Sequence, residues 1–129
     1  MDLKIDSQTF KQYLAKSRNG EFDLRLSSWF PDFDDIMTYA DLLGSGNPNN
    51  RGGYVSEEYD RWLKVVQGAS DQRVRMDAAA QLQKIIRNEV MVLPMAETGS
   101  AYVQHSKLKG VVRRVLGADP DYTYARVIK

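Results

Sequence analysis

The sequence contains no cysteine and only one histidine, and both shortages limit the chemistry open to it. Without cysteine, the chain has no disulfide, no thiolate zinc site and no cysteine nucleophile. It also lacks any apolar run long enough to span a bilayer. No signal peptide precedes the first residues, so we expect either a cytosolic protein or a chain that begins partway through a longer one.

Net charge is also nearly absent. The 18 lysines and arginines almost balance the 17 aspartates and glutamates, which leaves a formal net charge of +1. This balance gives no case for nucleic acid or an anionic membrane as the main partner. The basic cluster "KLKGVVRR" (residues 107–114) is short, and we interpret it as a solvated edge. We therefore predict no nucleic-acid partner.

What the chain does have is the size and composition of one globular domain, with 129 residues, 43% hydrophobic and 27% charged. Residues 2–5 ("DLKI") alternate polar and apolar side chains and predict a strand. A helix capped by Asp6 or Ser7 follows and ends at Gly20, and residues 21–30 predict a second strand. The order strand, helix, strand predicts a βαβ unit with two parallel strands and an α/β fold class.

The rest of the chain predicts three more helices and a strand-rich end. The helices are expected over residues 35–43, from Ser56 onward and from Ser70 to about Glu89. Their apolar stripes are formed by Tyr59, Trp62, Leu63 and Val66, and by Val74, Ala78, Leu82, Ile85 and Ile86. Residues 90–95 and 100–105 predict strands, and the tail, with its Gly-Ala-Asp-Pro-Asp turn, predicts a hairpin or two edge strands.

Three carboxylates gather in "SWFPDFDDI" (residues 28–36), directly after the second predicted strand. In open α/β sheets, ligands collect at the carboxyl ends of strands. Asp34 or Asp35 suits the cap of the helix that follows, which leaves Asp32 unexplained. Its aromatic neighbours Trp29 and Phe30 would exclude water and so favour an opposite charge. The predicted partner is an ammonium group, with a cation–π contribution of about 0.5–2 kcal/mol.

Rival hypotheses from other functional classes stay open at this stage. Asp32 and Asp34 offer hard oxygen ligands, so one rival is a magnesium-dependent hydrolase that uses both. His105 is the single histidine, but no nucleophile elbow surrounds any serine. The glycine-rich turn at residues 44–53 lacks the Gly-Lys-Ser/Thr ending of a phosphate loop. A second rival is an interaction module without a small ligand. Our own prediction is a protein with no catalytic residue, no metal and no cofactor.

A resemblance to a known family starts at "FDLRLSSWFPDFDD". It resembles a motif of the extracellular solute-binding proteins of family 5, the oligopeptide- and dipeptide-binding components of ABC importers. In that motif, a strand beginning Phe-Asp runs to Trp and then to Asp-Tyr-x-Asp-Pro. Three later stretches are similar to the family's Asn-rich turn and Tyr-Asp-x-Leu helix, its long helix and its closing segment: "NNRGGYVSEEYDRWL", "RMDAAAQLQKIIRNEVMVLPMAE" and "LKGVV…ADPDYTYARV". The resemblance therefore covers nearly the whole chain.

The resemblance implies a fold and a function. The family's chains are several times longer and fold as two α/β lobes, each a mixed sheet flanked by helices, in a periplasmic-binding-protein-like fold of type II. Residues 1–107 would be part of the second lobe, and residues 108–129 a return segment that belongs to the other lobe. The implied function is a non-enzymatic receptor that captures oligopeptides outside the cytoplasmic membrane and delivers them to an ABC permease. It would lie in the periplasm or be lipid-anchored.

The resemblance also assigns site residues. Asp32 matches the family aspartate that receives the free α-amino group of the bound peptide. Ser28, Trp29 and Phe30 would offer backbone groups and side-chain pockets to an extended peptide by strand addition. The fragment alone is expected to bind peptide poorly, and its unpaired tail to pair with another copy of the chain.

Three positions depart from the family motif. Phe33 replaces tyrosine, Ile36 stands where proline is usual, and Leu26 stands where some oligopeptide binders carry a basic residue. The peptide length preference, and a non-peptide cargo such as nickel, are therefore left open.

Overall fold

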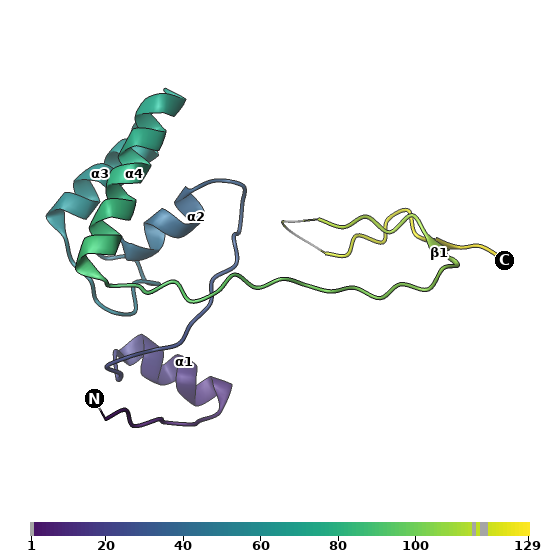
Figure 1. Cartoon of the computed structure of the whole chain (residues 1–129), viewed down its shortest axis with the longest axis horizontal. Helices are drawn as coiled ribbons and strands as arrows, with labels where there is room; N and C mark the ends of the chain where they lie inside the picture. The colour runs from purple at the N-terminus through teal and green to yellow at the C-terminus, as the bar shows by residue number, and fades with distance from the viewer. Residues whose placement is uncertain (1, 115, 117–118) are drawn as a thin grey trace.

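The chain is helical in its middle and extended toward both ends (Figure 1). The computed structural model describes residues 2–114, 116 and 119–129. The elements are α1 (Phe10–Asn19), α2 (Met37–Ala40), the 3-10 helix η1 (Asp41–Leu43), α3 (Glu57–Gly68), α4 (Gln72–Glu89), β1 (Leu108–Lys109) and β2 (Arg126–Val127). Among the described helices, none is both long and apolar enough to cross a membrane.

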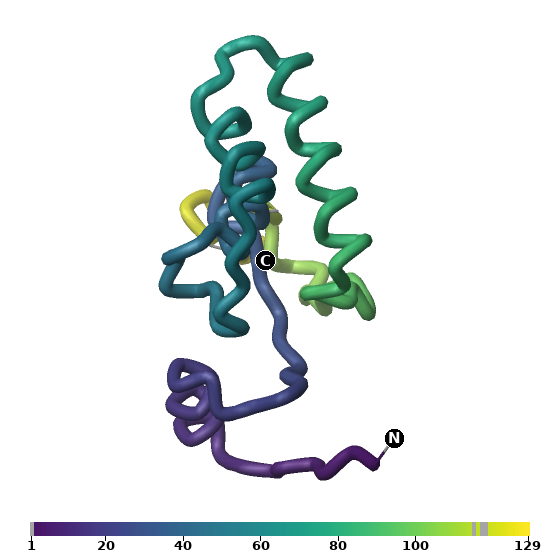
Figure 2. Tube along the Cα trace, turned by 90° about the vertical axis from the view of Figure 1, so that its left-hand side faces the viewer, coloured from purple at the N-terminus to yellow at the C-terminus, as the bar shows by residue number. Residues whose placement is uncertain are grey.

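The core lies between α3 and α4, which run side by side as a helical hairpin with α2 against them (Figure 2). Apolar residues three and four positions apart share one face of a helix, so each helix buries a stripe. The buried residues are Ala40, Tyr59, Leu63, Val66, Ala78, Ala79, Leu82 and Ile85. The predicted stripes are thereby confirmed, except that Val74 is 48% exposed at the start of α4.

Capping residues explain where the longer helices begin and end. Ser56 accepts a hydrogen bond from the backbone of Tyr59, as predicted. The predicted start of α4 at Ser70 was slightly early, because the helix begins at Gln72 and Asp71 caps it. The predicted caps of α1 were also wrong, since Thr9 forms a capping box with Gln12. Gly20 ends α1 with a φ of 71°, the left-handed conformation expected of a glycine at that position.

The strands predicted for residues 2–5, 21–30, 90–95 and 100–105 are wrong for the chain as described. In the described residues, β1 and β2 are the paired strands, so no parallel βαβ unit forms. A strand needs a neighbour for its backbone N–H and C=O groups. No described strand pairs with these segments, and alternating apolar side chains such as Ile5 (89% exposed) and Leu26 (84% exposed) face solvent.

The tail forms a narrow antiparallel hairpin that stands away from the helices (Figure 1). Leu108 pairs with Val127, and an isolated bridge joins Val112 to Asp121. This confirms the predicted hairpin. The predicted Gly-Ala-Asp-Pro-Asp turn falls partly on residues 117–118, which lie outside the described residues. Residues 91–107 run from α4 to the hairpin without helix or paired strand.

Candidate functional site

The acidic segment that leads into α2 is anchored to the helical hairpin by Asp35. Both oxygens of Asp35 accept hydrogen bonds from the guanidinium of Arg75, at 2.6 and 2.5 Å. Oδ1 also accepts from the backbone N–H of Met37, but the N-cap of α2 is Ile36, so the prediction that Asp34 or Asp35 caps this helix is wrong. Hydrogen bonds first from Arg75 and then from the Met37 amide lower the pKa of Asp35. Asp35 is therefore occupied by an internal contact and is not available to a ligand.

Asp32 is placed differently. Its backbone N–H donates to Oγ1 of buried Thr38 at 2.9 Å, which fixes the main chain at this position. Its side chain is exposed, and no described residue donates a hydrogen bond to its carboxylate. The three carboxylates of the segment are thus not equivalent, because Asp35 is bound internally while Asp32 and Asp34 are exposed.

A hollow of about 260 Å³ adjoins Asp32. Aromatic, aliphatic and acidic side chains line it, among them Trp29, Asp32, Phe33, Met37, Asp41 and Leu42. Its described lining residues include no lysine, arginine or histidine. An aromatic hollow with carboxylates and no cation of its own suits a positively charged group.

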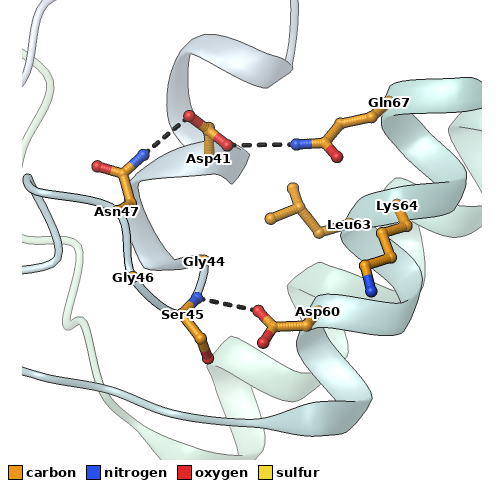
Figure 3. Close-up of a pocket in the computed structure, with 9 residues that line it drawn as sticks. All are labelled: Asp41, Gly44, Ser45, Gly46, Asn47, Asp60, Leu63, Lys64 and Gln67. Atoms are coloured by element: carbon orange, nitrogen blue, oxygen red, sulfur yellow. Dashed lines mark hydrogen bonds between the residues drawn. The ribbon is translucent and has the colours of Figure 1, made fainter.

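A larger hollow of about 450 Å³ lies next to the first, between the turn after η1 and the exposed side of α3 (Figure 3). The two hollows share Asp41, Asn47 and Gln67. Nδ2 of Asn47 donates to Oδ2 of Asp41 at 2.8 Å, and Nε2 of Gln67 donates to Oδ1 at 3.4 Å. These three side chains therefore form a hydrogen-bonded wall between the hollows.

The turn that carries Asn47 is held in place by two further contacts. The amide of Asn50 donates to the carbonyls of Gly44 and Tyr54, at 3.2 and 2.7 Å. The backbone N–H of Ser45 donates to Asp60 on α3 at 3.0 Å, and this hydrogen bond lowers the pKa of Asp60. The turn is thus closed on itself by Asn50 and joined to α3 by Asp60.

The predicted site residues are only partly brought together. Trp29 and Asp32 line the smaller hollow, whereas Ser28 and Phe30 do not. Trp29 is 39% exposed and Phe30 is 67% exposed, so the expected exclusion of water from Asp32 is not found.

The structure gives no support to the metal hypothesis. Within residues 2–114, 116 and 119–129, no three side chains of histidine, aspartate or glutamate lie together as metal ligands do. His105 is exposed, and its Nδ1 accepts a hydrogen bond from the backbone of Lys107 at 3.2 Å. The described residues therefore offer no further support for a magnesium hydrolase that uses Asp32 and Asp34.

Sequence reasoning missed Asp41 and the amides Asn47, Asn49 and Gln67, which line the smaller hollow. Asp41 had a local signal, because it lies three and four positions after Thr38 and Met37 and so shares their side of a helical turn. For the asparagines the indication was weaker, namely the cluster "NPNN" in the turn that resembles the family's Asn-rich turn. Nothing in the sequence indicated Gln67, because its position depends on the packing of α3 against η1.

Comparisons with known proteins agree with the resemblance drawn from the motifs. No family model matches the chain. It is 26% identical to the dipeptide-binding protein DppE of Bacillus subtilis over 91% of the chain and 22% of that protein. It is 28% identical to the periplasmic oligopeptide-binding protein OppA of Haemophilus influenzae over 98% of the chain and 23% of that protein. The chain thus spans less than a quarter of the length of these relatives.

A solved structure extends the likeness to the fold. The structure that describes peptide binding by the pheromone receptor PrgZ aligns with 96% of the chain. The aligned part is 24% of the PrgZ chain, with 27% identity and a TM-score of 0.81. These comparisons confirm the resemblance to the family 5 solute-binding proteins. They also confirm the fold class, since the chain has the fold of part of such a protein.

Proposed function

We propose that the protein carrying this chain is the substrate-binding component of an ABC importer, which captures oligopeptides outside the cytoplasmic membrane and delivers them to a permease. The proposal is supported by relatives that are named as peptide-binding proteins, among them the periplasmic OppA of Haemophilus influenzae. They are binding proteins, and capture and delivery of a peptide require no chemical step. The place of action is then the periplasm or the outer side of the membrane.

In this proposal the chain contributes part of a larger binding protein. Residues 1–107 form part of one lobe, and residues 108–129 return to the other lobe. The separation of the β1–β2 hairpin from the helices is compatible with this division (Figure 1). The exposed apolar residues of the predicted strands would then be covered by sheets that the remaining polypeptide supplies. In the isolated 129 residues, the apolar edges of the tail from about Leu108 would pair with a second copy of the chain.

One observation carries the assignment of the ligand. Asp32 is an exposed carboxylate with no described partner, beside a hollow that has aromatic walls and no cation among its described lining residues. The α-ammonium of a peptide supplies the missing charge and donates hydrogen bonds to the carboxylate. When the lobes close, water is excluded, so loss of either partner costs about 2–5 kcal/mol.

Strand addition would bind the rest of the peptide. The backbone of Ser28, Trp29 and Phe30 makes no hydrogen bond to the described main chain. These free N–H and C=O groups are able to pair with an extended peptide, and such pairing gives affinity without reading the side chains. A receptor of this kind accepts many sequences and selects chiefly for a free amino terminus.

Isothermal titration of the complete polypeptide with short free-amine peptides, and with the same peptides N-acetylated, tests the proposal. We expect acetylation to weaken binding by about 30-fold or more, because it removes the ammonium charge. Asp32→Asn should weaken binding of the free peptides similarly. Asp34→Asn is the matched control, since it removes the same charge two residues away and outside the hollow.

Each outcome of that titration is decisive. If acetylation does not change the affinity, the protein is still a peptide receptor, but Asp32 does not bind the α-ammonium. Equal effects of Asp32→Asn and Asp34→Asn also contradict this role of Asp32, because they indicate a general effect of charge. Absence of binding to both pools contradicts a peptide cargo and points to a non-peptide one.

A further inference from the structure

Asp41 lines both hollows, and two amides hold its carboxylate in place (Figure 3). The amide nitrogens of Asn47 and Gln67 donate to its two oxygens, at 2.8 and 3.4 Å. Amide donors orient a carboxylate without supplying a positive charge, unlike the guanidinium that binds Asp35. Asp41 has no ion-pair partner among the described residues, so it presents a fixed negative charge at the wall between the hollows.

The smaller hollow has one carboxylate more than the single α-ammonium of a simple peptide can balance. Asp32 and Asp41 both line it, and its described lining residues include no cation. One α-ammonium balances one carboxylate. The second loses water when the hollow is covered, and an unpaired buried charge is costly. A second positive charge on the peptide removes this cost.

The larger hollow, which Asp41 also lines, differs because it contains a cation. Lys64 of α3 lines it together with Asp60, so a cation belonging to the chain already lies among its carboxylates (Figure 3). Hydrogen bonds from Ser45 and, to a smaller extent, the charge of Lys64 stabilise ionised Asp60. The smaller hollow differs in having two carboxylates and no cation among its described lining residues.

We infer that Asp41 is a specificity-determining residue that favours peptides whose first side chain is positively charged. The inference rests on the proposed function, because it takes Asp32 as the partner of the α-ammonium. With that group at Asp32, the first side chain is the part of the peptide nearest to the second carboxylate. Lysine and arginine are then preferred at this position, and aspartate and glutamate are disfavoured by repulsion.

Titration of the complete polypeptide with Lys-Ala-Ala, norleucine-Ala-Ala and Glu-Ala-Ala tests the inference. Norleucine keeps the aliphatic length of lysine and lacks its charge. We expect the lysine peptide to bind about five- to tenfold more tightly than the norleucine peptide, between the effects of exposed and desolvated ion pairs. The glutamate peptide should bind most weakly. Equal affinities for the three peptides would overturn the inference without any variant being needed.

Two variants test whether the charge of Asp41 sets the preference for the lysine peptide. Asp41→Asn should bring the lysine and norleucine peptides within about twofold of each other, whereas Asp34→Asn should leave the preference intact. Asn49→Lys places a cation in the same hollow while keeping Asp41 and its two amide contacts, and it should also abolish the preference. A preference for lysine that persists in both variants would show that another residue sets it.

Acetylated peptides separate this inference from the proposed function. If acetylation weakens all three peptides equally but their affinities are the same, Asp32 remains the anchor and the role of Asp41 is wrong. If acetylation has no effect while the lysine preference disappears in Asp41→Asn, the hollow binds a cationic side chain and Asp32 is not the anchor.

Discussion

Arg75 and Asp35 lie 40 positions apart in the sequence and form a two-pronged ion pair that joins α4 to the segment carrying the candidate site. Nε of Arg75 also donates to the carbonyl of Val66 at the end of α3. One guanidinium therefore connects both helices of the hairpin to the residues that follow Asp32. The planar fork of arginine suits this double contact, and a lysine ammonium cannot reproduce it.

The first prediction concerns this ion pair. Arg75→Lys keeps the charge but loses the second prong and the contact to Val66, so the melting temperature should fall and peptide binding should weaken. The acetylation effect should stay, because Asp32 is unchanged. Thermal melts and titrations of the complete polypeptide measure both. Arg73→Lys is a matched control on the same helix, since Arg73 is exposed and its side chain has no described ion-pair partner. Equal losses in the two variants would contradict a special role for Arg75.

The second prediction concerns pH. Arg75 and the Met37 amide hold the pKa of Asp35 below its ordinary value of 3.8, so the folded state favours the ionised carboxylate. The unfolded state therefore binds more protons in this range. The resulting stability is complete above pH 3.8 and is lost as the pH falls from 3.8 through the lower, folded pKa. Urea unfolding at a series of pH values should show this loss in the wild type.

Asp35→Asn supplies the comparison for that pH series. The variant should be less stable at neutral pH, and its stability should fall less steeply in acid, because one of the groups that titrate has been removed. Asp60, Asp119 and Asp121 also have lowered pKa values, so some dependence on pH should remain. Identical slopes for variant and wild type would contradict the contribution assigned to Asp35.

Local and long-range features differed in how far the sequence predicted them. The stripes of α3 and α4 and the cap at Ser56 depend on residues within a few positions, so spacing alone predicted them. The strands at residues 2–5 and 21–30 depend on neighbours that the described chain does not supply, and alternation alone could not reveal this. The hollow beside Asp32 combines a turn with a face of α3, and its wall residue Asp41 was therefore missed.

The third prediction concerns the buried hydroxyl of Tyr59, which donates to the carbonyl of Ala40 at 2.7 Å and joins α3 to α2. Tyr59→Phe removes the donor and leaves a buried carbonyl without this partner, so it should lower the free energy of unfolding by about 1–2 kcal/mol. Denaturant unfolding followed by circular dichroism measures the change. Tyr54→Phe is the control, because its hydroxyl donates to Glu89 in a more exposed position and should cost less. A larger loss for Tyr54→Phe would show that burial does not set the cost.

The fourth prediction concerns Gly110, which follows β1 directly. Its φ is 77°, a conformation that favours glycine, and an added Cβ would lie 2.1 Å from the carbonyl oxygen of Tyr124. Gly110→Ala should therefore open the β1–β2 hairpin, because a backbone atom on the opposite side cannot move away without breaking the adjacent pairing. Amide hydrogen exchange should show lost protection at the Val112 and Asp121 amides, which bond each other's carbonyls. Gly99→Ala, where an added Cβ meets open space, should leave protection unchanged. Retained protection in Gly110→Ala would mean that the hairpin does not depend on this close approach.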